Sequence, residues 1–207
     1  MNRHSFLFLS TLSLLTSSAL AIPITYLQMH SSPGDYIGQG RDYYFDGSKG
    51  LFGARQAYFG NPTYLNRAVT ISFLDPGYSE YWYLNFSSAQ LGRNLAKGSY
   101  TAQRFPFEQI GFAGLDISGD GRGSNRLTGF FSILDLEFGL SGSVTRFAAE
   151  FEQHSEGNTP SLTGRVSYNS EAFNPAIPEP TTLTLFGLGL ITLVLGARRR
   201  KGYKGLF

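Results

Sequence analysis

Short stretches of alternating apolar and polar residues, separated by turn residues, run from Ile22 to about Tyr168. Alternation with a period of two is typical of β-strands that bury one face, and no segment of this part shows a convincing helical period. Turn signals such as Asp46-Gly47, Asn61-Pro62 and Asp75-Pro76-Gly77 separate the stretches. The pattern predicts strands near residues 42–45, 51–59, 67–74, 80–86, 98–105, 111–117, 126–138, 144–154 and 162–168.

One predicted hairpin can be aligned residue by residue if Ser141-Gly142 forms a two-residue turn. The aligned pairs are Leu134 with Ala149, Leu136 with Phe147, and Glu137 with Arg146. Apolar side chains then share one face, and most charged ones lie on the other. A sheet with one buried face needs a second layer, so we expect an all-β fold, an antiparallel β-sandwich; a jelly-roll arrangement or a flattened barrel satisfies the same pattern.

The first 21 residues have the layout of a secretory signal peptide. A short basic start with Arg3 and His4 precedes an apolar run, and small residues end in Ala19-Leu20-Ala21. This A-x-A ending is typical of a signal peptidase site, so residues 1–21 are predicted to be removed after Ala21. The rest of the chain is then expected to be exported.

A second apolar segment lies near the other end of the chain. Residues 181–197 contain no charged side chain, and a helix of that length is just long enough to cross a bilayer. Arg198, Arg199, Arg200 and Lys201 follow directly, and clustered basic residues mark the cytoplasmic side of a membrane helix. We therefore expect a single transmembrane helix with the folded part facing outward.

The segment Pro178-Glu179-Pro180 stands immediately before this helix. Two prolines around one residue favour an extended, rigid backbone that an enzyme can recognise as a strand-like peptide. The chain thus divides into a signal peptide (1–21), an exported β domain (22–174) and a linker with a tail (175–207). The tail comprises the Pro-Glu-Pro motif (178–180), the transmembrane helix (181–197) and the basic end (198–207).

The order of Pro-Glu-Pro, apolar helix and arginine cluster resembles the PEP-CTERM sorting signal of exported bacterial proteins. The resemblance implies recognition by exosortase, a membrane-embedded cysteine transpeptidase, with Pro178, Glu179 and Pro180 as the motif and Arg198, Arg199 and Arg200 as the stop. It also implies cleavage near the motif and transfer to the cell surface or extracellular matrix, in bacteria that make exopolysaccharide and biofilm. The protein is then a substrate of this chemistry and not an enzyme.

Composition and charge narrow the remaining function classes. The chain has no Cys, which excludes disulfides, thiol nucleophiles and Cys-ligated metals. Between Ile22 and Ile177 there are 11 Lys/Arg and 14 Asp/Glu, a formal charge of −3, although the whole chain carries +2. The basic excess therefore belongs to the ends, and nucleic-acid binding loses its electrostatic basis.

Oxygen-bearing side chains alternate in one glycine-rich segment, at Asp116, Ser118 and Asp120. This spacing is typical of the start of a calcium-binding loop, although Leu127 stands where a bidentate acid would complete it. A calcium site and an ordinary tight turn are both compatible with the pattern. No other cofactor is expected.

Two further groups of side chains are candidates for ligand contact. Glu150, Glu152 and His154 alternate on one predicted strand and share a face, as metal ligands, acid/base groups or an ordinary solvated face would. Trp82 lies among tyrosines that could stack on sugars, which suggests a polysaccharide-binding module as the alternative function. A carboxylate-based hydrolase, with acids such as Asp135 and Glu150, is a further alternative.

Residues 104–168 are also similar to a bacterial exported-domain family of unknown function. The similarity rests on three stretches, Arg104-Phe105-Pro106-Phe107, residues 114–123, and residues 151–157. Relatives often carry Cys where this chain has Ser124 and Ser155, which implies that the two loops are neighbours in space. The family has no known activity to transfer.

Overall fold

The computed structural model describes residues 22–57, 65–140 and 142–173. The strands are β1 (Ile24–Ser31), β2 (Asp42–Asp46), β3 (Leu51–Gln56), β4 (Ala68–Leu74), β5 (Tyr81–Ser87), β6 (Gly98–Arg104), β7 (Ala113–Gly119), β8 (Leu127–Phe138), β9 (Val144–Ser155) and β10 (Ser161–Ser170). A short 3-10 helix, η2 (Ala89–Leu91), is the only helix of this part of the chain. The all-β prediction is confirmed, and each predicted strand overlaps an observed one.

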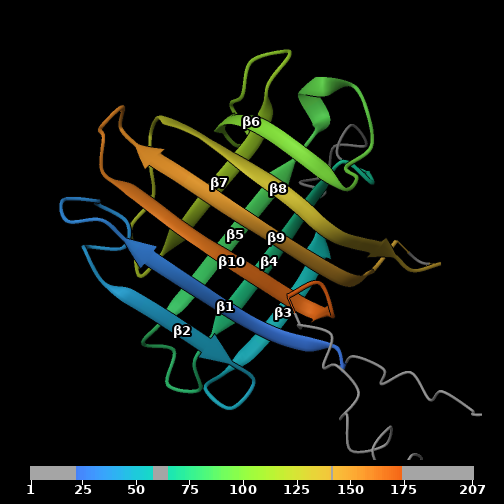
Figure 1. Cartoon of the computed structure of the whole chain (residues 1–207), viewed down its shortest axis with the longest axis horizontal. Helices are drawn as coiled ribbons and strands as arrows, with labels where there is room; N and C mark the ends of the chain where they lie inside the picture. Colours follow the sequence, from blue (N-terminus) through green and yellow to red (C-terminus); the bar gives the residue numbers. More distant parts are fainter. Residues whose placement is uncertain (1–21, 58–64, 141, 174–207) are drawn as a thin grey trace, which may run out of the picture. The chain divides into compact units, whose positions relative to one another are not determined.

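All ten strands belong to one sheet, in the order β2-β1-β10-β9-β8-β6-β7-β5-β4-β3 (Figure 1). Every neighbouring pair is antiparallel except β6 with β7, which is parallel. The sequence led us to expect an antiparallel sandwich of two sheets, whereas the strands form one continuous mixed sheet. Strand β6 lies between β8 and β7, so this parallel pair joins the two halves of the sheet.

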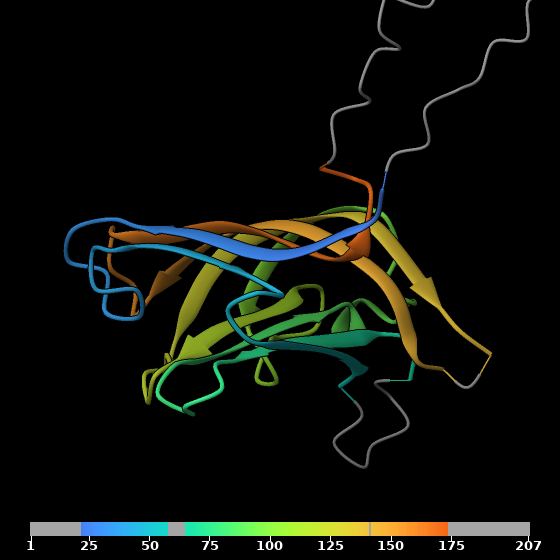
Figure 2. The same ribbon diagram turned by 90° about the horizontal axis from the view of Figure 1, so that it is seen from below.

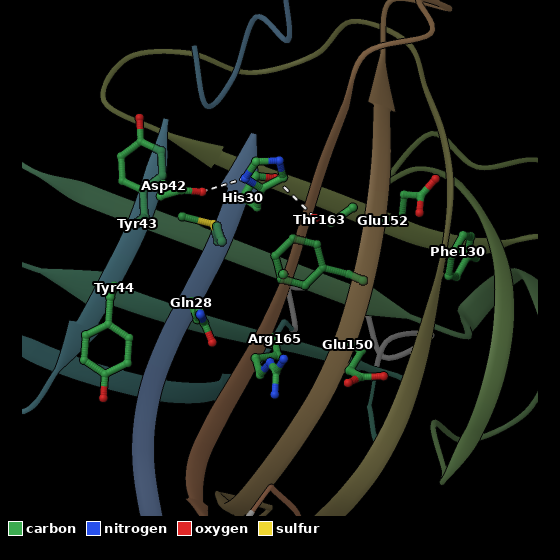
Figure 3. Close-up of a pocket in the computed structure, with 13 residues that line it drawn as sticks. Gln28, His30, Asp42, Tyr43, Tyr44, Phe130, Glu150, Glu152, Thr163 and Arg165 are labelled. Atoms are coloured by element: carbon green, nitrogen blue, oxygen red, sulfur yellow. Dashed lines mark hydrogen bonds and ion pairs between the residues drawn. The ribbon is translucent and has the colours of Figure 1, made fainter. Parts of the chain in front are cut away.

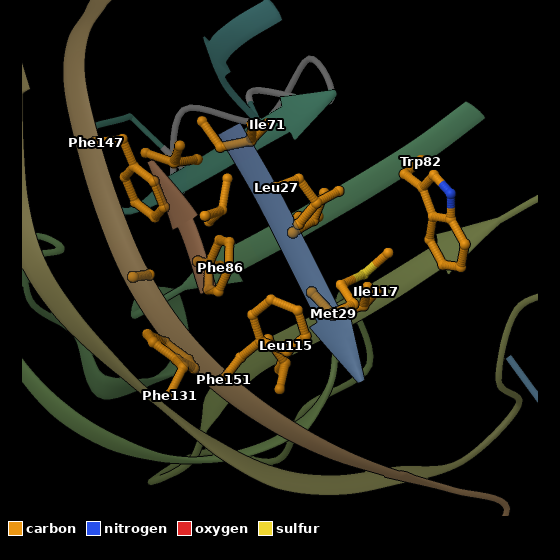
Figure 4. Packing of buried hydrophobic residues seen from close by; sticks show 14 of the residues in the cluster. Leu27, Met29, Ile71, Trp82, Phe86, Leu115, Ile117, Phe131, Phe147 and Phe151 are labelled. Atoms are coloured by element: carbon orange, nitrogen blue, oxygen red, sulfur yellow. The ribbon is translucent and has the colours of Figure 1, made fainter. Parts of the chain in front are cut away.

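The sheet curls so that its two halves face each other, as the side view shows (Figure 2). Aromatic side chains connect the halves: the rings of Phe45 and Phe73 stack at 4.2 Å, and those of Phe86 and Phe147 lie 5.1 Å apart. Figure 4 shows the packing of this core. Burial of each large apolar side chain stabilises the fold by about 1.5–3 kcal/mol, so these buried aromatic rings contribute substantially to the stability of the domain.

Strand β1 was not predicted, although its sequence alternates clearly. Leu27 and Met29 are buried in the core, while Gln28 and His30 are exposed on the outer face. The strand begins two residues after the predicted start of the mature chain. It pairs on both sides, with β10 and with β2, and is therefore an interior strand of the sheet.

The predicted hairpin is correct in part. Leu136 pairs with Phe147 and Glu137 with Arg146, as expected. A β-bulge between Ile133 and Asp135 then shifts the register, so that Ile133, and not Leu134, faces Ala149. An extra residue on one strand reverses which side chains point inward, and Leu134 is accordingly 37% exposed.

The predicted signal peptide (1–21) and the predicted transmembrane helix (181–197) lie outside the described residues. Within the described ranges, no helix has the length and apolar character needed to cross a bilayer.

Candidate functional site

A groove of about 690 Å³ lies on the outer face of the sheet, across strands β2, β1, β10, β9 and β8. Nine of its 13 lining residues carry a polar side-chain group, and the lining comes from neighbouring strands (Figure 3). The residues are Gln28, Met29, His30, Asp42, Tyr43, Tyr44, Phe130, Glu150, Phe151, Glu152, Thr163, Gly164 and Arg165.

The strand register arranges the outward side chains in two parallel rows (Figure 3). Cross-strand partners define the first row as Tyr44, Gln28, Arg165 and Glu150, and the second as Asp42, His30, Thr163, Glu152 and Phe130. Directly opposed residues on antiparallel strands have Cβ atoms about 5 Å apart. The fold therefore places a continuous series of donors, acceptors and two aromatic rings along one surface.

Several contacts within the groove orient its side chains. His30 Nδ1 lies 2.6 Å from Asp42 Oδ1, and the Thr163 hydroxyl donates to the His30 carbonyl at 3.3 Å. The Tyr44 ring stacks at 6.1 Å on that of Tyr26, and the Lys49 ammonium lies 5.5 Å from the Tyr44 centroid. Tyr44 nevertheless remains 49% exposed and Phe130 51% exposed. These two rings are available to a ligand.

Glu150, Glu152 and His154 lie on β9 with their side chains on the same face, as the sequence predicted. His154 Nε2 is 2.9 Å from Glu152 Oε1, and His154 Nδ1 is 2.9 Å from the Thr159 carbonyl. The imidazole thus bridges a carboxylate and a backbone oxygen. In the described part of the chain, no three His, Asp or Glu side chains form a cluster that could hold a metal ion.

Trp82 does not face a ligand. Its side chain is completely buried, its ring meets that of Tyr43 edge-on at 4.9 Å, and its cross-strand partner is Gly119. A Cβ atom at Gly119 would lie 2.5 Å from the indole, so glycine is needed there to admit the ring. The suggestion that Trp82 stacks on sugars is corrected, because the indole fills the core.

The candidate calcium loop is a strand followed by a tight turn. Asp116 and Ser118 belong to β7, so their side chains project from extended backbone. Asp120 and Gly121 both have positive φ, +50° and +76°, as in a two-residue hairpin turn closed by Gly119 and Arg122. This geometry cannot wrap three side chains around one ion.

The two acids of that segment have separate environments. Asp120 Oδ1 accepts a hydrogen bond from the Tyr81 amide at 3.0 Å, and its Oδ2 lies 3.7 Å from Arg122. Asp116 is largely buried, and this burial raises the pKa of its carboxyl to about 6, although the Arg104 charge opposes the shift. Its Oδ1 has no hydrogen-bond partner among the residues that the structure describes. Asp120 is therefore a structural residue, whereas the Asp116 carboxyl is largely buried with one oxygen unpartnered within the described ranges.

The acids proposed for a hydrolase are not paired with each other. Asp135 Oδ2 accepts a hydrogen bond from the Ser170 hydroxyl at 2.7 Å, and its two oxygens lie within 3.4 Å of Lys97 and Arg146. These partners lower the pKa of Asp135 against the opposing effect of burial, which is the largest single influence. Asp135 therefore serves as an ionised structural carboxylate, while Glu150 belongs to the groove.

The two loops that carry Ser124 and Ser155 are in contact. Ser124 donates a hydrogen bond to Ser155 across 2.8 Å, and both side chains are buried. The expectation that these loops are neighbours is confirmed.

The sequence analysis did not identify most of the residues that line the groove. Its aromatic ends, Tyr44 and Phe130, and its central residues, Gln28 and Arg165, come from four different strands. Each shows only the ordinary polar alternation of an outer face, apart from Phe130, a large apolar residue at an outward position. That mismatch was the one available signal.

The described domain thus belongs to the class of all-β proteins with a polar groove on a sheet face. A family model for the PEP-CTERM protein-sorting motif matches residues 176–201. Residues 176–201 therefore carry a PEP-CTERM sorting motif, which implies processing by exosortase, a membrane protein. Comparisons with curated proteins and with solved structures give no match.

Proposed function

We propose that this protein is an exported precursor that exosortase cuts near Pro178-Glu179-Pro180 and releases to the cell surface or extracellular matrix. Signal peptidase removes residues 1–21, and the helix of residues 181–197 holds the precursor in the membrane with Arg198–Arg200 on the cytoplasmic side. At the surface the β domain associates with exopolysaccharide and biofilm. It acts there by binding and not by catalysis.

The sorting-motif match at residues 176–201 is the observation that carries this proposal. It covers the Pro-Glu-Pro segment, the apolar stretch and the first four basic residues in one continuous match. The physical order is coherent, because an exposed, extended peptide is presented beside the membrane helix that delivers it to a membrane enzyme.

The fold suits loss of both ends. Ile24 at the start of β1 and Ser170 at the end of β10 are cross-strand partners. Both connections to the removable segments therefore leave the same end of the sheet. Strands β1 and β10 contribute to the core through Leu27, Leu162 and Val166, so the sheet stays complete after both cuts.

Intact-mass analysis of the protein from its native host tests the proposal. We expect a chain that begins at Ile22 and ends between Pro178 and Thr181. A Glu179→Ala variant should accumulate with the tail attached, because the recognised tripeptide is altered, whereas Glu171→Ala, outside the motif, should be processed normally. A mature wild-type chain that still carries Arg198–Phe207 would refute exosortase sorting.

A further inference from the structure

We propose that the groove across β2, β1, β10, β9 and β8 binds an extended, uncharged polysaccharide chain. This inference rests on the proposed association with polysaccharide and gives it a site. It does not depend on which bond exosortase cuts.

The two exposed aromatic rings stand at opposite ends of the groove. Tyr44 lies on β2 and Phe130 on β8, with β1, β10 and β9 between them. Four inter-strand steps place strands β2 and β8 about 19 Å apart, the length of several sugar rings. Tyr44 belongs to the first row and Phe130 to the second, so the path between the rings crosses the strands obliquely. Aromatic faces pack against the C–H faces of sugars, and rings on rigid strands lose little side-chain entropy when they do so. The spacing suits a chain that crosses the strands.

The side chains between the rings match the hydrogen-bonding needs of sugars. Gln28 offers a donor and an acceptor, Arg165 offers donors, and Glu150 offers acceptors, all in one row. Each sugar hydroxyl both donates and accepts, so alternating groups along a path can satisfy successive hydroxyls. The three side chains are exposed, which means that a ligand can reach them without rearrangement of the sheet.

The charge of the groove selects among polysaccharides. Its lining has three carboxylates, Asp42, Glu150 and Glu152, against the single guanidinium of Arg165. The formal charge of these four groups sums to −2, and this repels uronate or sulfated chains. A neutral hexose polymer avoids this repulsion and can still use every polar group. The occupant that the groove fits is therefore a neutral glycan.

Affinity electrophoresis and calorimetry on the detergent-purified full chain test this site. The neutral probes are laminarin, dextran and galactomannan, the anionic probe is alginate, and the cationic probe is chitosan oligosaccharide. We expect binding to at least one neutral probe, and none to alginate. Tyr44→Ala and Phe130→Ala should each weaken that binding about three- to tenfold, as loss of one aromatic contact predicts.

Matched controls keep the test specific. Tyr83→Ala removes an aromatic ring of similar exposure, 42%, from β5 in the other half of the sheet and should leave binding unchanged. Gln28→Ala removes a hydrogen-bonding amide and leaves both aromatic rings in place, and it should also weaken binding. Circular dichroism verifies that all variants are folded.

Several outcomes would overturn the groove assignment: no binding to any neutral probe, a preference for alginate or chitosan, or equal loss from Tyr83→Ala. Release of reducing ends that Glu150→Gln abolishes would make the groove a hydrolase site instead. None of these results alters the termini of the mature chain, so the intact-mass test judges sorting separately.

Discussion

Single side chains in the β domain owe their chemistry to their neighbours. Asp116 and Asp120 stand four positions apart, yet Asp120 is tied to the Tyr81 amide and Arg122 while Asp116 is buried. Burial of a carboxylate disfavours its charged form, which raises the pKa and lowers stability wherever the group must ionise. Position in the sheet, and not residue type, separates these two aspartates.

Asp116→Asn should stabilise the domain at neutral pH. Because the folded-state pKa of Asp116, about 6, exceeds the ordinary value of 3.8, the folded state binds the proton more tightly. Stability should therefore fall as pH rises from about 4 to 6 and then level off. The neutral Asn avoids this loss, on the order of 3 kcal/mol at pH 7. Urea unfolding of both proteins at pH 4.5 and 7.5 measures the difference, and equal pH dependence in the two would contradict the assignment.

A paired substitution, Ser124→Cys with Ser155→Cys, should form a disulfide bond in an oxidising compartment. The two hydroxyl oxygens are 2.8 Å apart and buried, so two sulfurs can meet with little movement of the loops. Closing a loop of about 30 residues is expected to stabilise the domain by roughly 3–4 kcal/mol. Thiol titration and thermal unfolding, with and without reductant, check this. The single Ser155→Cys variant serves as control; free thiols in the double variant would show that the loops are misplaced.

At the scale of elements, the Gln153 side chain continues the hydrogen bonding of β7 beyond the end of β6. The β6–β7 pairing ends at Arg104 and Leu115, so Ile117 on β7 lies beyond the partner strand. The buried Gln153 of β9 occupies that position. Its Oε1 accepts from the Ile117 amide at 2.8 Å, and its Nε2 donates to the Ile117 carbonyl at 2.9 Å. An amide side chain thus replaces the missing backbone groups.

Gln153→Leu should destabilise the domain by about 2–4 kcal/mol. The substitution keeps the volume similar but leaves a buried amide and a buried carbonyl of Ile117 without these partners. Gln28→Leu, at an exposed position of β1, should change stability by less than about 0.5 kcal/mol. Urea unfolding curves compare the two variants. Similar small effects from both would mean that the Gln153 bridge contributes nothing.

At the scale of the whole molecule, the sorting motif and the proposed binding groove lie in different parts of the chain. The sorting signal lies at residues 176–201, and the groove lies on a face of the β domain. The tail can be removed without loss of a groove residue, because the last of them, Arg165, precedes it. A delivery tail and a binding face can therefore be altered independently.

The sequence by itself determined the sorting motif and the strand content. A sorting signal is read as a linear peptide, so residues 178–180 and the basic cluster carry their meaning in order and spacing. Strand alternation is equally local, and it predicted β2 to β10 and the pairing of Glu137 with Arg146. Only β1 was not predicted, although its residues Leu27 and Met29 alternate with polar residues.

The tertiary structure alone decided the sheet order, the bulge at Leu134, the burial of Trp82 and the composition of the groove. Each depends on which strands become neighbours, and pairing between distant segments leaves no periodic trace in a single sequence. Tyr44 and Phe130 are 86 positions apart in the chain, yet the order β2-β1-β10-β9-β8 puts them on one surface. Local alternation tells which side chains share a face of a strand, but only the assembled sheet tells what that face meets.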